Sequence, residues 1–146
     1  MKKKMTMWIK VVCIALCVMI VIPCVFISCS DNKDEIVEKA RGELIGTWNA
    51  SVSTGYSIKT HKFTFSNSGN VSYLKRDTSS YSSSGYDLTG TYVVEYIGDE
   101  LVATITWDAD SLGYAAYYGV ENKVNLIYNE DNGNLSVIFD DITFTK

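Results

Sequence analysis

The side chains able to perform acid–base or nucleophilic chemistry are few and scattered along this 146-residue chain. His61 is the only histidine. Zinc sites combine several histidines or cysteines, so a lone histidine cannot build one, and we interpret His61 as a surface or rim residue of a strand. Serines crowd residues 79–84, but a serine hydrolase needs a histidine base beside its nucleophile. The sequence therefore predicts no catalytic constellation, no cofactor, and a protein that is not an enzyme.

Paired acidic residues are the second kind of candidate. Asp108 and Asp110 match the opening of a calcium-binding loop, but Gly119 stands where such a loop places its bidentate glutamate. The acids at residues 99–100 and 140–141 are of the kind that general acid–base catalysis can use. Neither pair has a supporting group nearby in the sequence. Turn and bulge chemistry explains all of them more simply, and we expect no metal site.

Tyrosines point most directly to binding. A tyrosine combines a flat apolar ring with a polar hydroxyl, which suits stacking on sugars and the lining of protein interfaces. Five of them fall in or near predicted loops and one uncertain strand: Tyr81, Tyr86, Tyr114, Tyr117 and Tyr118. We interpret these five as candidate contacts for a ligand or partner. The alternative is that they cover the ends of the fold or pack in its core.

The first 28 residues have the layout of a secretory leader. Four lysines stand among the first ten residues, and residues 11–27 carry no charge. A basic start, an apolar run and a small residue before the cleavage point define such signals. The apolar run is short for a permanent span, and Pro23 would disturb its far end. An uncleaved membrane helix that ends at Cys29 is the alternative.

The segment Phe26-Ile27-Ser28-Cys29 resembles a lipobox, the signature of bacterial lipoproteins. Ser28 and Cys29 match the pattern, and Phe26 stands where leucine is commoner. The resemblance implies that Cys29 is lipidated with fatty acids such as palmitate and anchors the protein to a membrane. Residues 30–35 resemble the acidic tags that send some Gram-negative lipoproteins to the cell surface. We therefore expect an envelope protein in the outer membrane, with the outer surface favoured over the periplasmic face.

In residues 29–146, which would form the mature chain, Cys29 is the only cysteine. The fold then cannot contain an internal disulfide and must depend on a packed core. Four of the 13 basic residues lie in the leader, which leaves nine against 17 acidic ones and a formal charge near −8. Such a charge repels phosphate groups, so we expect no nucleic-acid partner.

The remainder of the chain predicts an acidic tether followed by short strands. Residues 29–43 are charged and form a tether that ends in a short helical turn. Beyond them, aromatic, β-branched and threonine-rich composition favours strands. We predict eight, at residues 46–53, 56–66, 71–76, 88–97, 101–107, 114–120, 123–128 and 135–145. The last contains a bulge near Asp140-Asp141. Antiparallel strands joined by short turns suggest a closed barrel, because closure removes exposed edges.

Leu44-Ile45-Gly46-Thr47-Trp48 resembles the glycine-x-tryptophan opening of lipocalins and of the lipocalin-like domains of bacterial lipoproteins. The resemblance covers about residues 44–146. It implies an all-β fold, a small antiparallel up-and-down β-barrel, in which Trp48 plugs one end. The last strand contains no arginine to stack on that tryptophan. The domain is also short for a lipocalin, so its own side chains can fill the barrel.

These features predict three parts: a lipoprotein signal peptide at 1–28, an acidic tether at 29–43, and a lipocalin-like β-barrel domain at 44–146. The predicted function is non-enzymatic binding, at the loop end of the barrel, of a small apolar or glycan-like ligand or of an envelope protein partner. The alternative is a structural or accessory envelope lipoprotein whose filled barrel has no small-molecule site.

Overall fold

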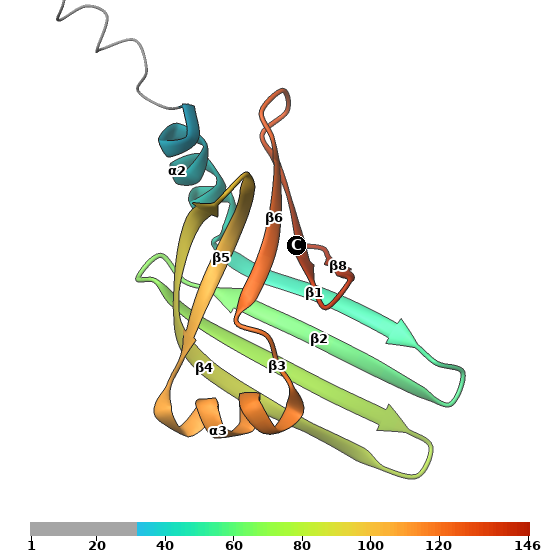
Figure 1. Ribbon diagram of the computed structural model, residues 1–146. Coiled ribbons are helices and arrows are strands. Elements are labelled where there is room, and N and C mark those ends of the chain that lie inside the picture. Colours follow the sequence, from blue (N-terminus) through green and yellow to red (C-terminus); the bar gives the residue numbers. More distant parts are fainter. Residues whose placement is uncertain (1–31) are drawn as a thin grey trace, which may run out of the picture. The chain divides into compact units, whose positions relative to one another are not determined.

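The computed structural model describes residues 32–146 as two helices and eight strands (Figure 1). Cys29 and the predicted signal peptide lie outside the described residues. The helices are α2, Asn32–Leu44, and α3, Ala109–Tyr118. The strands are β1 Gly46–Ser53, β2 Ser57–Phe65, β3 Asn70–Ser79, β4 Ser83–Ile97, β5 Glu100–Trp107, β6 Lys123–Asn129, β7 Asn134–Phe139 and β8 Ile142–Phe144. Neither helix of this part of the chain has the length and apolar character needed to cross a membrane.

The strands form one antiparallel sheet in sequence order, from β1 to β8. The sheet returns to its own first edge where Asn49 of β1 and Thr145 exchange two backbone hydrogen bonds, with N···O distances of 2.7 and 2.9 Å. This contact pairs backbone groups that an open sheet would leave exposed. The fold is therefore a small, nearly closed up-and-down β-barrel, which confirms the predicted fold class.

One predicted strand, at residues 114–120, is wrong, because most of this segment belongs to the helix α3. Ser111 and Ala115 are buried, and their spacing of four places both on one face of a helix. The helix ends at Gly119, whose left-handed φ of 62° lets its N–H reach back to carbonyls of the last turn. The connection between the strands predicted at 71–76 and 88–97 is also shorter than expected, since β3 and β4 extend into it.

The predicted bulge near Asp140-Asp141 is wrong as well. The two aspartates form the turn between β7 and β8, so the single predicted last strand is in fact two. Asp140 and Asp141 have φ angles of 52° and 58°. Two successive positive φ angles are typical of the type I′ hairpin turn, and aspartate tolerates this region better than most residues.

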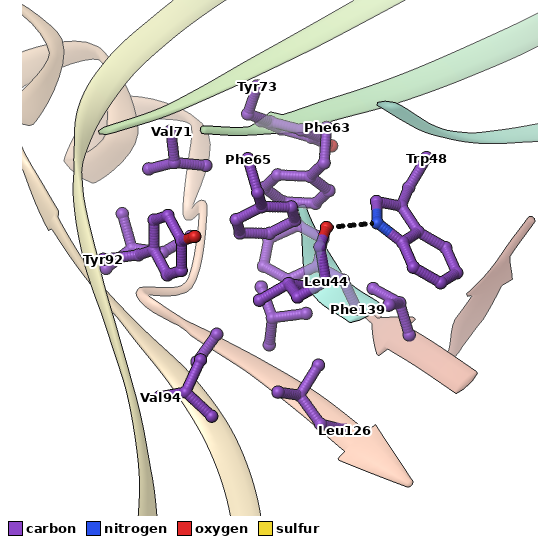
Figure 2. Packing of buried hydrophobic residues seen from close by; sticks show 14 of the residues in the cluster. Leu44, Trp48, Phe63, Phe65, Val71, Tyr73, Tyr92, Val94, Leu126 and Phe139 are labelled. Carbon is purple, nitrogen blue, oxygen red and sulfur yellow. Dashed lines mark hydrogen bonds between the residues drawn. The ribbon is translucent and has the colours of Figure 1, made fainter. Parts of the chain in front are cut away.

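Cross-strand register arranges the inward-facing residues of β1–β4 in layers. Trp48, Phe63, Tyr73 and Leu88 follow one another as register partners across the four strands, and all are buried. The Phe63 and Tyr73 rings stack with centroids 4.5 Å apart, and Phe139 packs edge-on against Phe63 at 5.0 Å (Figure 2). Aromatic side chains thus fill the barrel at this level.

Helix α2 packs on the barrel through its last turn, where Ala40 and Leu44 are fully buried. The Leu44 carbonyl accepts a hydrogen bond from Trp48 Nε1 at 2.8 Å, and the Glu43 carbonyl accepts one from Lys146 Nζ at 2.7 Å. Carbonyls in the last turn of a helix lack partners within it, so these two side chains supply them. The Lys146 ammonium also lies 5.5 Å from the centroid of a Trp48 ring, a cation–π contact.

This helix is longer than the short turn predicted for the end of the tether, and residues 35–146 form one compact unit. The second half of the predicted tether is therefore in contact with the barrel.

The two buried tryptophans of the barrel provide a matched test of the Trp48 hydrogen bond. Trp107, at the end of β5, has a buried indole N–H with no hydrogen-bond partner in residues 32–146. Trp48→Phe should lower the free energy of unfolding by about 2–4 kcal/mol, because it leaves the Leu44 carbonyl unpaired and removes part of a packed ring. Trp107→Phe removes an unsatisfied donor and should cost less. Urea denaturation measures both losses, and equal losses would contradict the role assigned to the hydrogen bond.

Candidate functional site

The barrel lining changes from apolar to polar one level further toward the tips of the β1–β2 and β3–β4 hairpins. The next inward-facing residues are again register partners across the four strands: Ala50, His61, Lys75 and Tyr86. His61 is buried, and the other three are half-buried. We call these four residues the polar layer. It lies directly beside the buried layer of Trp48, Phe63, Tyr73 and Leu88, which we call the Trp48 layer. The strand register that builds the core therefore also positions the polar groups.

His61 is buried rather than exposed at a surface or rim, which corrects the sequence-based interpretation. Its side chain is 3% exposed, and its Nδ1 lies 2.7 Å from the Tyr73 hydroxyl, within hydrogen-bond distance. The His61 ring also packs edge-on against Phe144. The alternation of side chains along a strand could have revealed this. Residues two apart share a face, so His61 lies on the same face of β2 as Phe63 and Phe65.

Burial lowers the pKa of His61 below its ordinary value, and the ammonium of Lys75 adds to this effect while Asp140 opposes it. Burial also raises the pKa of the Tyr73 hydroxyl far above that of an ordinary tyrosine, with smaller contributions from Tyr86 and Asp140. The imidazole and the phenol are therefore both neutral near pH 7. They form an uncharged hydrogen-bonding pair, with the charged Lys75 at their side.

Tyr86 connects the polar layer to helix α3. Its ring stacks on that of Tyr118 with centroids 4.5 Å apart and an angle of 18° between the planes. Tyr117 packs edge-on against Tyr118 at 4.9 Å. The three rings form a continuous chain that leads from the barrel lining onto the outer side of α3.

Small residues hold α3 against the barrel. Ser111 accepts a hydrogen bond from the Thr89 backbone N–H at 2.8 Å, and Ala115 is buried one turn later. The large side chains of the helix point the other way, with Tyr114 59%, Tyr117 82% and Tyr118 51% exposed. An ordinary surface helix buries its large apolar residues and exposes its small and polar ones. Helix α3 has the reverse arrangement.

Two hollows meet at Tyr118. A shallow apolar depression of about 350 Å³ lies over α3 and is lined by Asp110, Gly113, Tyr114, Tyr117 and Tyr118. A small polar cavity of about 60 Å³ lies on the other side, where its lining includes Tyr73, Lys75, Tyr86, Tyr118, Glu121 and Asp140. Tyr118 thus separates an apolar face from a group of charged side chains.

The structure brings together four of the five tyrosines singled out in the sequence: Tyr86, Tyr114, Tyr117 and Tyr118. We call these four residues the aromatic surface. The fifth, Tyr81, lies in the turn of the β3–β4 hairpin, away from α3 (Figure 1), and is 98% exposed. Tyr81 therefore does not belong to the same site.

Sequence reasoning missed a groove of about 450 Å³ at the end of the barrel where β4 turns into β5. Ile36 of α2, Leu101, Leu126 and Ile138 contribute apolar side chains. The wider lining consists of tyrosines, an amide, carboxylates and one more isoleucine: Tyr96, Tyr128, Asn125, Asp99, Glu100, Glu130 and Ile127. The sequence contained a weak signal, because Tyr96 and Tyr128 each stand just before a turn.

The acidic residues considered for calcium or catalysis lie in turns, at the start of α3 or, for Glu100, at the first residue of β5. Asp108 precedes α3 and accepts a hydrogen bond from the Thr89 hydroxyl at 2.7 Å. Throughout residues 32–146, no group of three or more histidine, cysteine or carboxylate side chains is placed to hold a metal ion.

A scan against protein-family models finds no match, and searches among curated proteins and solved structures find no significant match. What the site can bind is therefore inferred from its own side chains.

The pH dependence of stability tests the environment of the only histidine. Because the folded pKa of His61 lies below the ordinary value of 6.5, the unfolded chain takes up the proton first as the pH falls. The stability from a neutral His61 is complete above about pH 6.5 and is lost as the pH falls toward the folded pKa. His61→Gln should remove the part of the pH dependence below about pH 6.5 that is due to this group. Urea denaturation at several pH values measures it, and parallel curves for both proteins would contradict the assignment.

Proposed function

We propose that the protein is a lipid-anchored lipoprotein of the cell envelope whose barrel binds a ligand or partner at the aromatic surface without catalysing a reaction. The observation that carries this proposal is the reversed helix α3, which buries Ser111 and Ala115 and exposes its tyrosines. Contiguous exposed rings of this kind mark interaction sites on soluble domains. Small side chains at the barrel let the helix lie close, and the tyrosines are left available for contact.

The filled interior supports binding on the outside of the barrel. Phe63, Tyr73 and Phe139 pack against one another inside the barrel, in the space that a ligand bound in its lumen would occupy. A purely structural or accessory lipoprotein would share this filled interior. The exposed rings of α3 favour the binding function over that alternative, because a structural role gives no reason to expose them.

The aromatic surface and helix α2 belong to different ends of the barrel. Helix α3 lies at the opposite end of β5 from the β4–β5 turn beside α2 (Figure 1). The tyrosines of α3 are therefore not covered by α2, and a partner can approach them.

The groove of about 450 Å³ supports a second candidate function, binding of a small apolar ligand. Its volume is within the range of roughly 300–1,000 Å³ that ligand pockets occupy. Ile36 of α2 lines this groove together with Leu101, Leu126 and Ile138, so its walls offer apolar contacts to such a ligand.

Replacement of Cys29 tests the anchor. Cys29→Ala should abolish labelling by a fatty-acid probe and should move the protein from the membrane fraction to the soluble fraction, or stop its processing. Cys24→Ala is the matched control, because Pro23 before it makes Cys24 a poor match to a lipobox. Unchanged fatty-acid labelling of the Cys29→Ala variant would refute lipidation at this residue.

Photo-cross-linking tests the binding surface. A benzophenone side chain at position 117, in the aromatic surface, should form discrete adducts in intact cells of the source organism. The same group at position 81, on an equally exposed hairpin turn, is the control and should give none of these adducts. Absence of position-specific adducts at 117 would contradict the proposed binding surface.

A further inference from the structure

We propose, as a step that rests on the proposed function, that the aromatic surface and the adjoining polar cavity form one site for the neutral sugar rings of a glycan. A sugar ring presents C–H groups on its faces and hydroxyls around its edge. It therefore needs a flat apolar side chain and polar groups next to each other. Tyr118 stands at the junction of two such halves, the depression over α3 and the polar cavity.

The apolar half is rigidly built. One face of Tyr118 is covered by Tyr86, whose centroid lies 4.5 Å away, and the edge-on ring of Tyr117 contacts it at 4.9 Å. These contacts fix the orientation of Tyr118 before any ligand arrives. A fixed aromatic ring loses little conformational entropy on binding, which favours its use as a stacking platform.

The polar half contains both donors and acceptors. The Lys75 ammonium lies 5.9 Å from the Tyr86 ring centroid, and Glu121 and Asp140 line the same cavity. Ion pairs such as Lys39–Glu35 and Arg41–Glu38 lie on α2 and do not involve the cavity residues. Among residues 32–146, no carboxylate forms an ion pair with the half-buried Lys75. Its N–H donors and the nearby carboxylate acceptors can bind the hydroxyls of one sugar, and hydrogen bonds to charged groups are the stronger ones.

The cavity volume indicates how a sugar would lie. About 60 Å³ corresponds to roughly two water molecules at about 30 Å³ each, which is too small for a whole ring. The ring would therefore stack on the exposed part of Tyr118, with one hydroxyl or hydroxymethyl group directed into the cavity toward Lys75.

Charge selects neutral glycans over anionic ones. Asp110, Glu121, Asp140 and Asp141 surround the two hollows and the adjacent turn, and among residues 32–146 Lys75 is the one cation that lines either hollow. A sulfated, uronic or sialic acid residue would meet repulsion from these carboxylates. Neutral hexoses and amino-sugar acetamides carry no such penalty.

The test is an array of neutral, sialylated and sulfated oligosaccharides, probed with the full lipoprotein in a detergent that has no sugar head group. We expect binding to a subset of the neutral oligosaccharides and none to their anionic counterparts. Calorimetric titration with the best neutral oligosaccharide should then show at least about tenfold weaker binding for Tyr118→Ala and for Lys75→Met. Tyr81→Ala, the matched tyrosine outside the site, should leave the affinity unchanged.

One further variant keeps the test decisive. Tyr118→Trp retains a stacking ring and should still bind the oligosaccharide. Binding by this variant would show that the weaker binding of Tyr118→Ala comes from the lost ring and not from a defect in folding. No binding to any neutral oligosaccharide, or affinity unchanged by both site variants, would overturn the inference. Position-specific cross-links at residue 117 without glycan binding would overturn only the glycan, whereas absence of both signals would overturn the proposed function as well.

Discussion

The structure depends most on the contacts that Trp48 makes at the closure of the barrel. This residue lies in β1 next to Asn49, which pairs with Thr145 to bring the two edges of the sheet together. Its N–H satisfies a carbonyl at the end of α2, and its ring faces the ammonium of Lys146. The preceding helix, the first strand and the end of the chain therefore meet at one side chain. Together with the Asn49–Thr145 pair and the packing of Phe144 on Phe63, these contacts hold the two edges of the barrel together.

Closure fixes register, and register fixes the candidate site. A slip of one residue between neighbouring strands would exchange inward and outward faces, and the buried Trp48 layer prevents such a slip because its large rings fit only inside. Once Phe63 and Tyr73 are fixed, His61 and Lys75 must face the same way one level further along. The polar layer is thus a direct consequence of the core. This explains how a small, filled barrel can hold several polar side chains in a defined arrangement without a large cavity.

Alternating strands were predictable from the sequence, whereas elements that depend on small residues or on turn geometry were not. The alternation around Leu101–Trp107 and the Gly46–Trp48 motif correctly indicated a barrel. Residues 114–120 suggested a strand because tyrosine favours strands, and the buried face of the true helix consists of small residues that give no apolar period. Asp140-Asp141 was ambiguous because a two-residue turn without glycine or asparagine can also be interpreted as a bulge. His61 was misplaced because residue type was given more weight than parity.

The same small residues that hid α3 from sequence analysis explain why it is suited to binding. A helix that contacts the barrel through Ser111 and Ala115 gains little stability from apolar burial, since these side chains carry little apolar area. Its position is set instead by the Ser111–Thr89 hydrogen bond, the Gly119 cap and the Tyr86–Tyr118 stack. Tyr114 and Tyr117, which point outward on this helix, add little to the fold, and their exposure carries a cost in hydration. A partner that covers these rings would recover that cost on binding, which is the physical reason to propose a binding surface on α3 rather than in the filled interior.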